Sequence, residues 1–310
     1  MVGNNFNKKI SAYIESLRPI QWIKNLSLLA AAILNGQLTN HDVLYKSIFG
    51  FIVFCLLSSS SYLINDLVDI RKDRLHPVKK NRPLARGAIS EPNAIFLALT
   101  LTLIGLSLSI FIGFGFFIIS LIFIILQFTY SFFLKKKAIL DIITIAISFI
   151  IRAYAGEIAS GYHLPIWIML TVIFLSLFIA SGKRRSEMFN TGSITRSSLK
   201  GYRKSLLNFY TTMFAVCTLI TYAMFTFFEE PLNFDGVIHN FLLQNFPDLL
   251  NRKWYMVTLL PVIFGIMRYG QIIFEMQEGE RPERIVATDI PLLFSILVWG
   301  LMMVIIVYVI

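Results

Sequence analysis

The chain has 310 residues, of which 56% are hydrophobic and only 15% are charged, and its formal net charge is +10. Soluble domains average about 45–50% apolar and about 25% charged residues, so this composition excludes an ordinary soluble protein and indicates one that spans a membrane. The basic residues lie between apolar segments, a distribution that argues against a nucleic-acid-binding protein.

Apolar stretches of about 20 residues, the length that crosses the hydrocarbon core of a bilayer, recur along the chain. We expect an all-α polytopic membrane protein, a bundle of nine transmembrane helices that forms a single catalytic domain over residues 1–310. The first helix begins with the polar residues Gln21, Lys24 and Asn25. The nine expected helices cover approximately residues 21–37, 44–64, 92–112, 114–134, 139–160, 165–182, 206–228, 254–274 and 290–310.

Nearly all of the 28 Lys and Arg residues lie in the N-terminal segment and in every second loop after it. The opposite loops hold only Lys46, Arg252 and Lys253. Because cytoplasmic loops carry the excess of Lys and Arg, we expect the N-terminus, the long charged loops and the active site on the cytoplasmic face of the cell membrane. The outer loop near residues 229–253 mixes acidic and aromatic residues and is expected to contain a short interfacial helix.

The segment RPIQWIKN, residues 18–25, brings polar side chains into the start of the first helix. On an α-helix Arg18, Lys24 and Asn25 share an arc of about 120°. A Lys or an Asn that enters a membrane span is unfavourable unless it faces a polar cavity. We expect Lys24 and Asn25 to bind substrate phosphates, with Arg18 nearer the surface, where snorkelling to the interface is the alternative.

The second helix ends in NDLVDIRKD, residues 65–73, where Asp66, Asp69 and Asp73 lie within an arc of about 60°. Carboxylates this close repel one another unless a cation lies between them. Mg²⁺ takes oxygen ligands and shares them with substrate phosphates. The three aspartates are therefore predicted Mg²⁺ ligands that face a diphosphate, and with Asn65 they are the predicted catalytic residues. The alternative is an ordinary charged helix end, neutralised by the basic residues around it.

Basic residues follow this motif and recur at the end of the sixth predicted helix. The loop RLHPVKKNRP supplies Arg74, Lys79 and Arg82 as expected phosphate-binding residues. The later motif SGKRRSE supplies Lys183 and Arg184 at a helix end. We expect both to bind phosphate, although membrane topology alone would account for one or two of these cations.

Arg152 lies deep in the fifth predicted helix, about 16 Å along the helix from Asp141. An arginine at that depth needs a partner or a polar cavity. An ion pair with Glu157 is one interpretation. Contact with a lipid phosphate, or support of the cavity wall, is the other.

Several of these motifs resemble one known superfamily. NDLVDIRKD is similar to the NDxxDxxxD motif of the UbiA superfamily of intramembrane prenyltransferases, which have nine transmembrane helices and a Mg²⁺–diphosphate site. Further segments are similar to one branch, the decaprenyl-phosphate phosphoribosyltransferases. These segments are LRPIQWIKN at 17–25, DRLHPVKKNRPLARG at 73–87, YSFFLKKKAILDI at 130–142, FIIRAYAG at 149–156, SGKRRSE at 181–187 and, less closely, GERPERIVATD at 279–289.

The resemblance implies a Mg²⁺-dependent transferase that moves 5-phosphoribose from phosphoribosyl diphosphate to a polyprenyl phosphate and releases diphosphate. The product would be a precursor of a cell-wall arabinan or a related glycan. Prenyl-transferring members carry a second aspartate-rich motif around the fifth and sixth helices, where this sequence has Asp141 alone. Tyr130, Lys135, Lys137 and Asp141 suit instead a donor with an additional phosphate or sugar hydroxyls.

Two alternatives stay open. The first is a prenyltransferase of the same fold that moves a polyprenyl group from its diphosphate to an aromatic acceptor. The second is a transporter, which would place paired charges deep in several spans, whereas this sequence has only Arg152 there. The expected partners are phosphoribosyl diphosphate, a polyprenyl phosphate and membrane lipids, without nucleic acid, and the composition is compatible with an oligomer.

Overall fold

The computed structural model describes residues 2–76, 78–190, 197–229, 241, 243–245 and 252–309. Every regular element in this part of the chain is helical, which confirms the predicted all-α class. The interfacial helix predicted near residues 229–253 lies largely outside the described residues.

Eight described helices are long and apolar enough to cross a membrane. They are α3 His41–Leu75, α4 Glu91–Ile110, α5 Phe114–Phe132, α6 Leu140–Ser160, α7 Ile166–Asn190, α8 Lys204–Phe228, the continuous helix Trp254–Met276 and α13 Ile290–Tyr308. The continuous helix consists of η7 Trp254–Thr258, α11 Leu259–Gln271 and the π-helix η8 Ile272–Met276.

These eight helices coincide with eight of the nine predicted spans, and the longest of them carries the acidic motif. Helix α3 has 35 residues and continues through NDLVDIRKD, so the aspartates stay on one helix. Large apolar side chains cover the outside of the described structure, and Phe96 and Phe114 are 73% and 76% exposed. An apolar surface of this kind faces lipid. The chain is therefore a multi-pass membrane protein.

The first predicted span differs from the expected α-helix. Pro19–Leu29 form a 3₁₀ helix, η1, of 11 residues, and Ala30–Leu34 form a short α-helix, α2, of 5 residues. A 3₁₀ helix rises about 2.0 Å per residue and an α-helix about 1.5 Å, so the two together extend roughly 30 Å, the thickness of a bilayer core. Because a 3₁₀ helix is more extended than an α-helix, this short segment is long enough to span the membrane. That it forms the ninth transmembrane span stays a prediction.

Close packing explains the unusual conformation of η1. Arg18 adopts a left-handed conformation (φ 54°) between α1, Val2–Leu17, and η1. The carbonyl of Leu28 approaches α6 so closely that a Cβ on Gly156 would lie 2.3 Å from its oxygen. On the other side, Trp22 Nε1 donates a hydrogen bond to Ser59 Oγ on α3 at 3.0 Å. The segment is thus held between α3 and α6.

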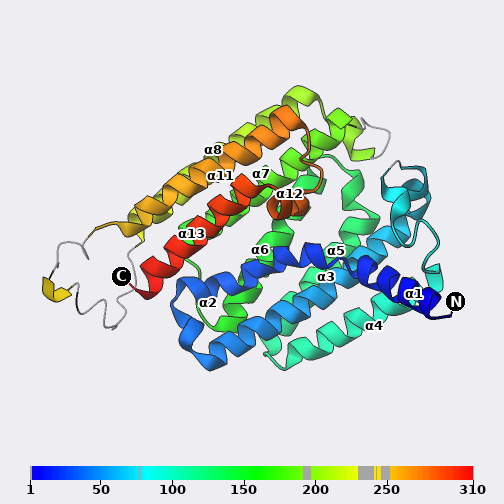
Figure 1. Ribbon diagram of the computed structural model, residues 1–310, viewed down its shortest axis with the longest axis horizontal. Coiled ribbons are helices and arrows are strands. Elements are labelled where there is room, and N and C mark those ends of the chain that lie inside the picture. Colours follow the sequence, from blue (N-terminus) through cyan, green and yellow to red (C-terminus); the bar gives the residue numbers. More distant parts are fainter. Residues whose placement is uncertain are drawn as a thin grey trace.

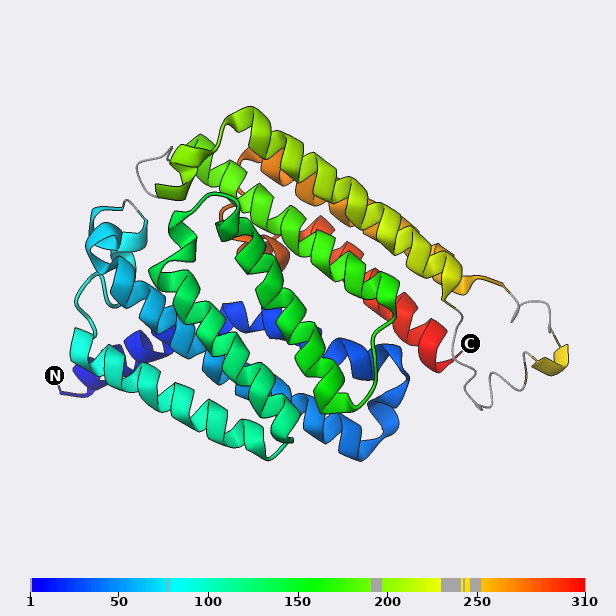
Figure 2. The same ribbon diagram turned by 180° about the vertical axis from the view of Figure 1, so that it is seen from behind.

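The long helices form two groups that lie side by side (Figures 1 and 2). Helices α3, α4, α5 and α6 pack on one another, while α7, α8, α11 and α13 form the second group, and α6 joins the groups by packing on α7. A short helix, α12 Pro282–Thr288, packs against η1 between them. The marked N- and C-termini lie at opposite ends of the molecule (Figure 1).

Aromatic rings fill the interior between α3, α5 and α6. Phe54, Phe116 and Phe123 are fully buried, and the ring centroid of Phe54 lies 4.9 Å from that of Phe123 and 5.7 Å from that of Phe116. Buried rings at these separations contribute large apolar areas and about 0.5–1.5 kcal/mol per pair beyond them. This packing fixes the middle of α3 against α5.

Candidate active site

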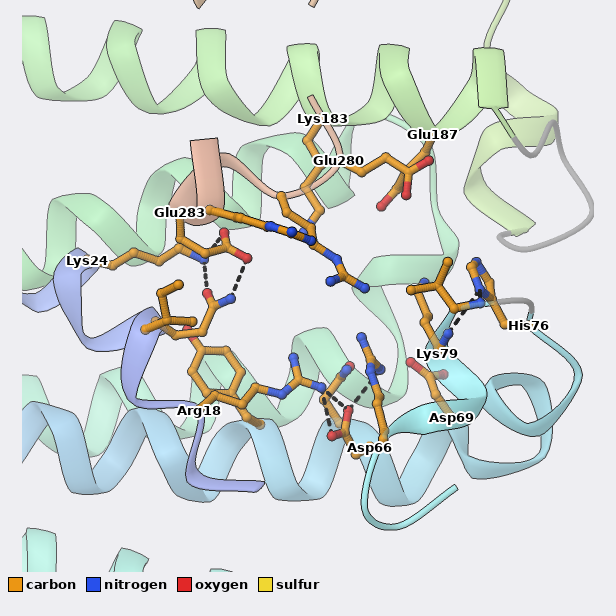
Figure 3. A pocket seen from close by; sticks show the side chains of 18 of the residues that line it. Arg18, Lys24, Asp66, Asp69, His76, Lys79, Lys183, Glu187, Glu280 and Glu283 are labelled. Carbon is orange, nitrogen blue, oxygen red and sulfur yellow. Dashed lines mark hydrogen bonds and ion pairs between the residues drawn. The ribbon is translucent and has the colours of Figure 1, made fainter. Parts of the chain in front are cut away.

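A cavity of about 1290 Å³ lies between the two groups of helices, where the end of α3 faces α12 (Figure 3). Such a volume accommodates a substrate larger than most drug-like ligands. Its lining residues come from α1, η1, α3, α5, the 3₁₀ turn η4 (Leu134–Lys136), α7, residues 76 and 78–83 after α3, and the segment 276–288 that contains α12. The predicted site residues in the lining are Arg18, Lys24, Asn65, Asp66, Asp69, Lys79, Arg82, Tyr130, Lys135 and Lys183.

The acidic edge of the cavity belongs to α3, and each of its aspartates has a basic partner. Arg18 Nη2 donates to both carboxylate oxygens of Asp66 at 2.5 and 2.7 Å. Arg82 Nη1 donates to Asp66 at 3.0 Å and to Asp73 at 2.6 Å. Lys135 Nζ donates to Asp69 Oδ2 at 2.7 Å. These pairs offset the repulsion among the three carboxylates.

The donor atoms of this edge fit Mg²⁺. Lys135 Nζ lies 2.7 Å from Asp69 Oδ2 and 3.0 Å from Asn65 Oδ1, so both oxygens point to one position that accepts a positive charge. Both are hard oxygen donors of the kind that Mg²⁺ prefers, and Mg²⁺ takes one or two protein carboxylates and fills its other positions with phosphate oxygens and water. In the described part of the chain no three acidic, His or Cys side chains converge as a ready-made metal cluster. A metal site in which substrate phosphates supply the remaining ligands is consistent with that finding.

Asp73, the third predicted metal ligand, lies apart from Asp66 and Asp69. Its side chain is buried and does not line the cavity. It binds Arg82, whose guanidinium then reaches Asp66. The spacing on α3 placed Asp73 on the right face, but the segment after the helix folds back over it, and this long-range contact has no signal in the helical periodicity.

The segment after α3 contributes a cap as well as cations. His76 Nδ1 accepts hydrogen bonds from the backbone N–H groups of Val78 and Lys79 at 3.2 and 3.3 Å. Burial and the Lys79 ammonium lower the pKa of His76, so the ring stays neutral and keeps its role as an acceptor. Lys79 itself lines the cavity, and Tyr130 does so from α5.

The wall opposite the aspartates combines cations from two elements with a glutamate from a third. Lys24 on η1, Lys183 on α7 and Glu283 on α12 all line the cavity (Figure 3). Lys24 Nζ lies 3.4 Å from Glu283 Oε2 and donates to Gln21 Oε1 at 2.5 Å, and Gln21 Nε2 donates to Glu283. Burial alone would raise the pKa of Glu283, but Lys24, Lys183 and the hydrogen bond from Gln21 lower it to about 2. Glu283 is therefore ionised.

Helix α7 holds the segment that carries Glu283. Arg185 Nη1 donates to the carbonyl of Ile273 at 2.6 Å, and Ser186 Oγ accepts the N–H of Gly279 at 3.1 Å. Asn190 Nδ2 donates to the carbonyl of Gln277 at 3.0 Å. Three side chains in one helical stretch thus fix the course of the chain between η8 and α12, and so fix this cavity wall.

Two predicted substrate-binding residues, Asp141 and Arg184, form a buried network outside the cavity lining. Asp141 accepts hydrogen bonds from Tyr202 at 2.7 Å and Ser198 at 2.9 Å. Arg184 Nε lies 3.1 Å from Asp141 Oδ2, and Arg184 Nη1 donates to Glu187, which does line the cavity. Asp141 and Arg184 therefore orient a cavity residue and join the α7–α8 connection to α6.

Arg152 and Asn25 pair with each other below the cavity. Arg152 Nε donates to Asn25 Oδ1 at 2.7 Å, and its guanidinium lies 4.6 Å from the ring centroid of Phe123. The ion pair considered for Glu157 is replaced by other contacts, because Glu157 Oε1 accepts the backbone N–H of Leu164 at 2.9 Å. Asn25 and Arg152 hold η1 against α6, outside the cavity lining.

Arg74 and Lys137 were also expected at the site, and both are exposed outside its lining. Arg74 Nε donates to the carbonyl of Ala85 at 3.3 Å. Glu187 and Glu283, in contrast, line the cavity and were missing from the predicted set. The only sequence signal for Glu283 was the segment GERPERIVATD, because its partners lie more than 90 residues away in the chain.

Comparisons with known proteins agree with this geometry. A model of the UbiA prenyltransferase family matches residues 26–237. The chain is 37% identical to decaprenyl-phosphate phosphoribosyltransferase of Mycolicibacterium smegmatis, over 94% of this chain and 90% of the relative. It is 33% identical to the protein of the same name from Corynebacterium glutamicum, over 96% and 86%. A UbiA homolog from Archaeoglobus fulgidus bound to DMAPP and Mg²⁺ has the same fold, with a TM-score of 0.65, 20% identity, and coverage of 94% of this chain and 98% of that one.

Proposed function

The chain belongs to the UbiA prenyltransferase family, and from this premise we propose that it transfers 5-phosphoribose from phosphoribosyl diphosphate to a polyprenyl phosphate and releases diphosphate. The observation that carries the proposal is the cavity with two unlike walls. One wall has the oxygen donors of α3, and the other has the cations of η1 and α7. Relatives that span nine-tenths of the chain carry the name of this activity.

The α3 wall suits the diphosphate of the donor. Asn65, Asp66 and Asp69, which line the same wall, would hold Mg²⁺, which when bound neutralises negative charge on the leaving diphosphate. Arg18, Arg82 and Lys135 are within reach of the same region, because each already binds an α3 side chain there. These cations would change partners from carboxylate to phosphate oxygens as the donor binds.

The reaction needs no general base. In the transfer, the bond between C1 of ribose and the diphosphate oxygen breaks, and a bond from C1 to an oxygen of the lipid phosphate forms. The attacking phosphate is already an anion, so no proton has to be removed from it. The residues named above have to position anionic groups that repel one another and to neutralise them, and such preorganised electrostatics supplies much of the rate enhancement in many enzymes.

The alternative, prenyl transfer from a lipid diphosphate to an aromatic acceptor, has less support. It calls for a second aspartate-rich motif on the wall opposite α3. The one candidate, Asp141, is fully buried in a network outside the lining. The acids that the described structure places opposite α3 are glutamates next to lysines, such as Glu187 and Glu283.

We further propose that residues 1–310 form one catalytic domain and that the product serves as a glycan precursor. We also propose that the cavity faces the cytoplasm in the cell membrane. The basic segments 76–86 and 135–137 lie at the cavity end of the bundle, which supports this orientation. A soluble phosphorylated donor made in the cytoplasm would then reach the site directly.

The experiment that tests the activity uses purified protein in detergent with Mg²⁺ and two pairs of substrates. The first pair is phosphoribosyl diphosphate with a polyprenyl phosphate, and the second is a polyprenyl diphosphate with an aromatic acid. We expect diphosphate release with the first pair only. Release confined to the second pair would overturn the proposed function.

A further inference from the structure

The cavity has a second charged group, remote from the aspartates, that the transfer as described leaves unassigned. Lys24, Lys183 and Glu283 belong to three elements that are far apart in the sequence, and their side chains meet on the wall formed by η1, α7 and α12 (Figure 3). Lys24 and Lys183 are amines of the kind that bind phosphate oxygens, and Glu283 adds a carboxylate beside Lys24.

The carboxylate of Glu283 is held at the cavity wall by groups that favour its ionised form. The residue is 8% exposed, Gln21 donates a hydrogen bond to its Oε1, and Lys24 Nζ lies 3.4 Å from its Oε2. Oε2 accepts no hydrogen bond within the described part of the chain. A fixed negative charge therefore lies directly beside Lys24, where a phosphate that binds Lys24 has to approach it.

Apolar side chains adjoin the same wall. Ile20 on η1 is 50% exposed and lines the cavity, and Ile285 on α12 lines it as well. Tyr62 and Val78 line the aspartate side as well, but the side chains next to its carboxylates are polar or charged, such as Asn65 and Lys135. Of the two substrates, the one with a hydrocarbon chain fits the wall where charge and apolar side chains adjoin.

We propose that Lys24 and Lys183 form the subsite for the phosphate of the lipid substrate, and that Glu283 is a specificity-determining residue that favours a lipid monophosphate over a lipid diphosphate. The inference rests on the proposed function, because it assigns the acceptor to one wall of the same cavity. A phosphate monoester carries about −1.5 to −2 charges at neutral pH, and a diphosphate carries more. Each additional negative charge next to Glu283 is repelled, which is discrimination by an unfavourable contact.

The test measures binding of farnesyl phosphate and farnesyl diphosphate to the full-length protein in detergent by titration calorimetry. EDTA is present, so that metal at the aspartate wall does not contribute. We expect the wild type to bind the monophosphate more tightly. In Glu283→Gln the ratio of the two dissociation constants (Kd of the diphosphate over Kd of the monophosphate) should fall by about tenfold or more, since a like charge is removed at close range.

Two further variants serve as controls for this ratio. Glu283→Asp keeps the charge and should keep most of the preference for the monophosphate. Glu275→Gln makes the same change of charge on the same segment, but Glu275 is exposed, lies outside the cavity and binds Gln271, so the ratio should stay at the wild-type value. An unchanged ratio in Glu283→Gln, or an equal fall in Glu275→Gln, would overturn the inference.

Turnover measured separately distinguishes this inference from the proposed function. Phosphoribosyl transfer by the wild type together with an unchanged ratio in Glu283→Gln refutes only the role of Glu283. A fall in the ratio without any phosphoribosyl transfer refutes the proposed function, while the charge selectivity of Glu283 is upheld.

Discussion

At the scale of single residues, the aspartates of α3 differ in their basic partners and in their exposure to the cavity. Asp69 shares Lys135 with Asn65 and faces the cavity, whereas Asp73 is buried and binds Arg82. The Arg82 side chain is 25% exposed and also binds Asp66, so removal of Asp73 should cost less than the about 3–5 kcal/mol of a fully buried pair. The two aspartates therefore differ in their surroundings although they lie four residues apart on one helix, and we predict that they differ in role.

Substitution of these two aspartates should give different results. In Asp69→Asn we expect the rate to fall by about 100-fold or more and the Mg²⁺ concentration for half-maximal rate to rise, because a metal ligand loses its charge. In Asp73→Asn we expect the thermal stability to fall, with an unchanged Mg²⁺ requirement for the activity that remains. Steady-state rates over a Mg²⁺ titration, with melting temperatures in detergent, measure both effects. An equal shift in the Mg²⁺ requirement of the two variants would contradict the assignment.

Sequence spacing predicted the residues whose positions depend on one helix alone. Asn65, Asp66 and Asp69 lie on one face of α3 and line the same cavity, as the helical repeat required. The helical repeat could predict neither the presence of Glu283 in the cavity lining nor the burial of Asp141. They depend on contacts with elements far away in the chain, such as η1 and the segment Ser197–Gly201.

At the scale of elements, η1 is the feature that sequence patterns described least well. Its apolar composition predicted a membrane-spanning α-helix, and the structure has a 3₁₀ helix held between α3 and α6. The cause is tertiary packing, because Gly156 lets the backbone at Leu28 approach α6, and Arg152 binds Asn25. Local propensity carries no information on such contacts.

A methyl group at Gly156 tests this packing. In Gly156→Ala the new Cβ would lie 2.3 Å from the Leu28 carbonyl oxygen, so η1 has to move. We expect a loss of about 1–3 kcal/mol in stability, as is typical for overpacking, and a higher KM, because η1 carries Lys24. The matched control is Gly115→Ala on α5, where the nearest neighbour of a Cβ is Ile158 Cγ2 at 3.5 Å, an ordinary contact. The melting temperatures and KM values of the two variants are compared with those of the wild type. Equal changes in Gly156→Ala and Gly115→Ala would contradict a fixed position for η1.

At the scale of the whole molecule, charge and hydropathy predicted most of the architecture. Eight of the predicted spans are apolar helices, since a chain in lipid has to satisfy its backbone hydrogen bonds within each span. The orientation in the membrane stays a prediction from the distribution of Lys and Arg. The cavity itself was not predictable, because it is formed by helix ends and short segments that meet only after the bundle has assembled.

Labelling of single cysteines tests the orientation in cells. Lys137 is exposed at the cavity end, and His41 is exposed at the start of α3, at the other end of that helix. In a background that lacks both Cys55 and Cys217, we expect Lys137→Cys to react with a membrane-impermeant maleimide only after the cells are permeabilised. His41→Cys should react in intact cells, and the reverse pattern would place the cavity outside the cytoplasm.

The central claim is that the cavity joins ribose 5-phosphate to a lipid phosphate, and the mass of the lipid product tests it most directly. The measurement is mass spectrometry of the lipid after incubation of the wild-type protein with Mg²⁺, phosphoribosyl diphosphate and a polyprenyl phosphate. We predict a product that contains the intact lipid phosphate and one ribose 5-phosphate, formed together with one equivalent of diphosphate. A lipid of unchanged mass from active, folded protein, or a product that has lost the lipid phosphate, would contradict the account.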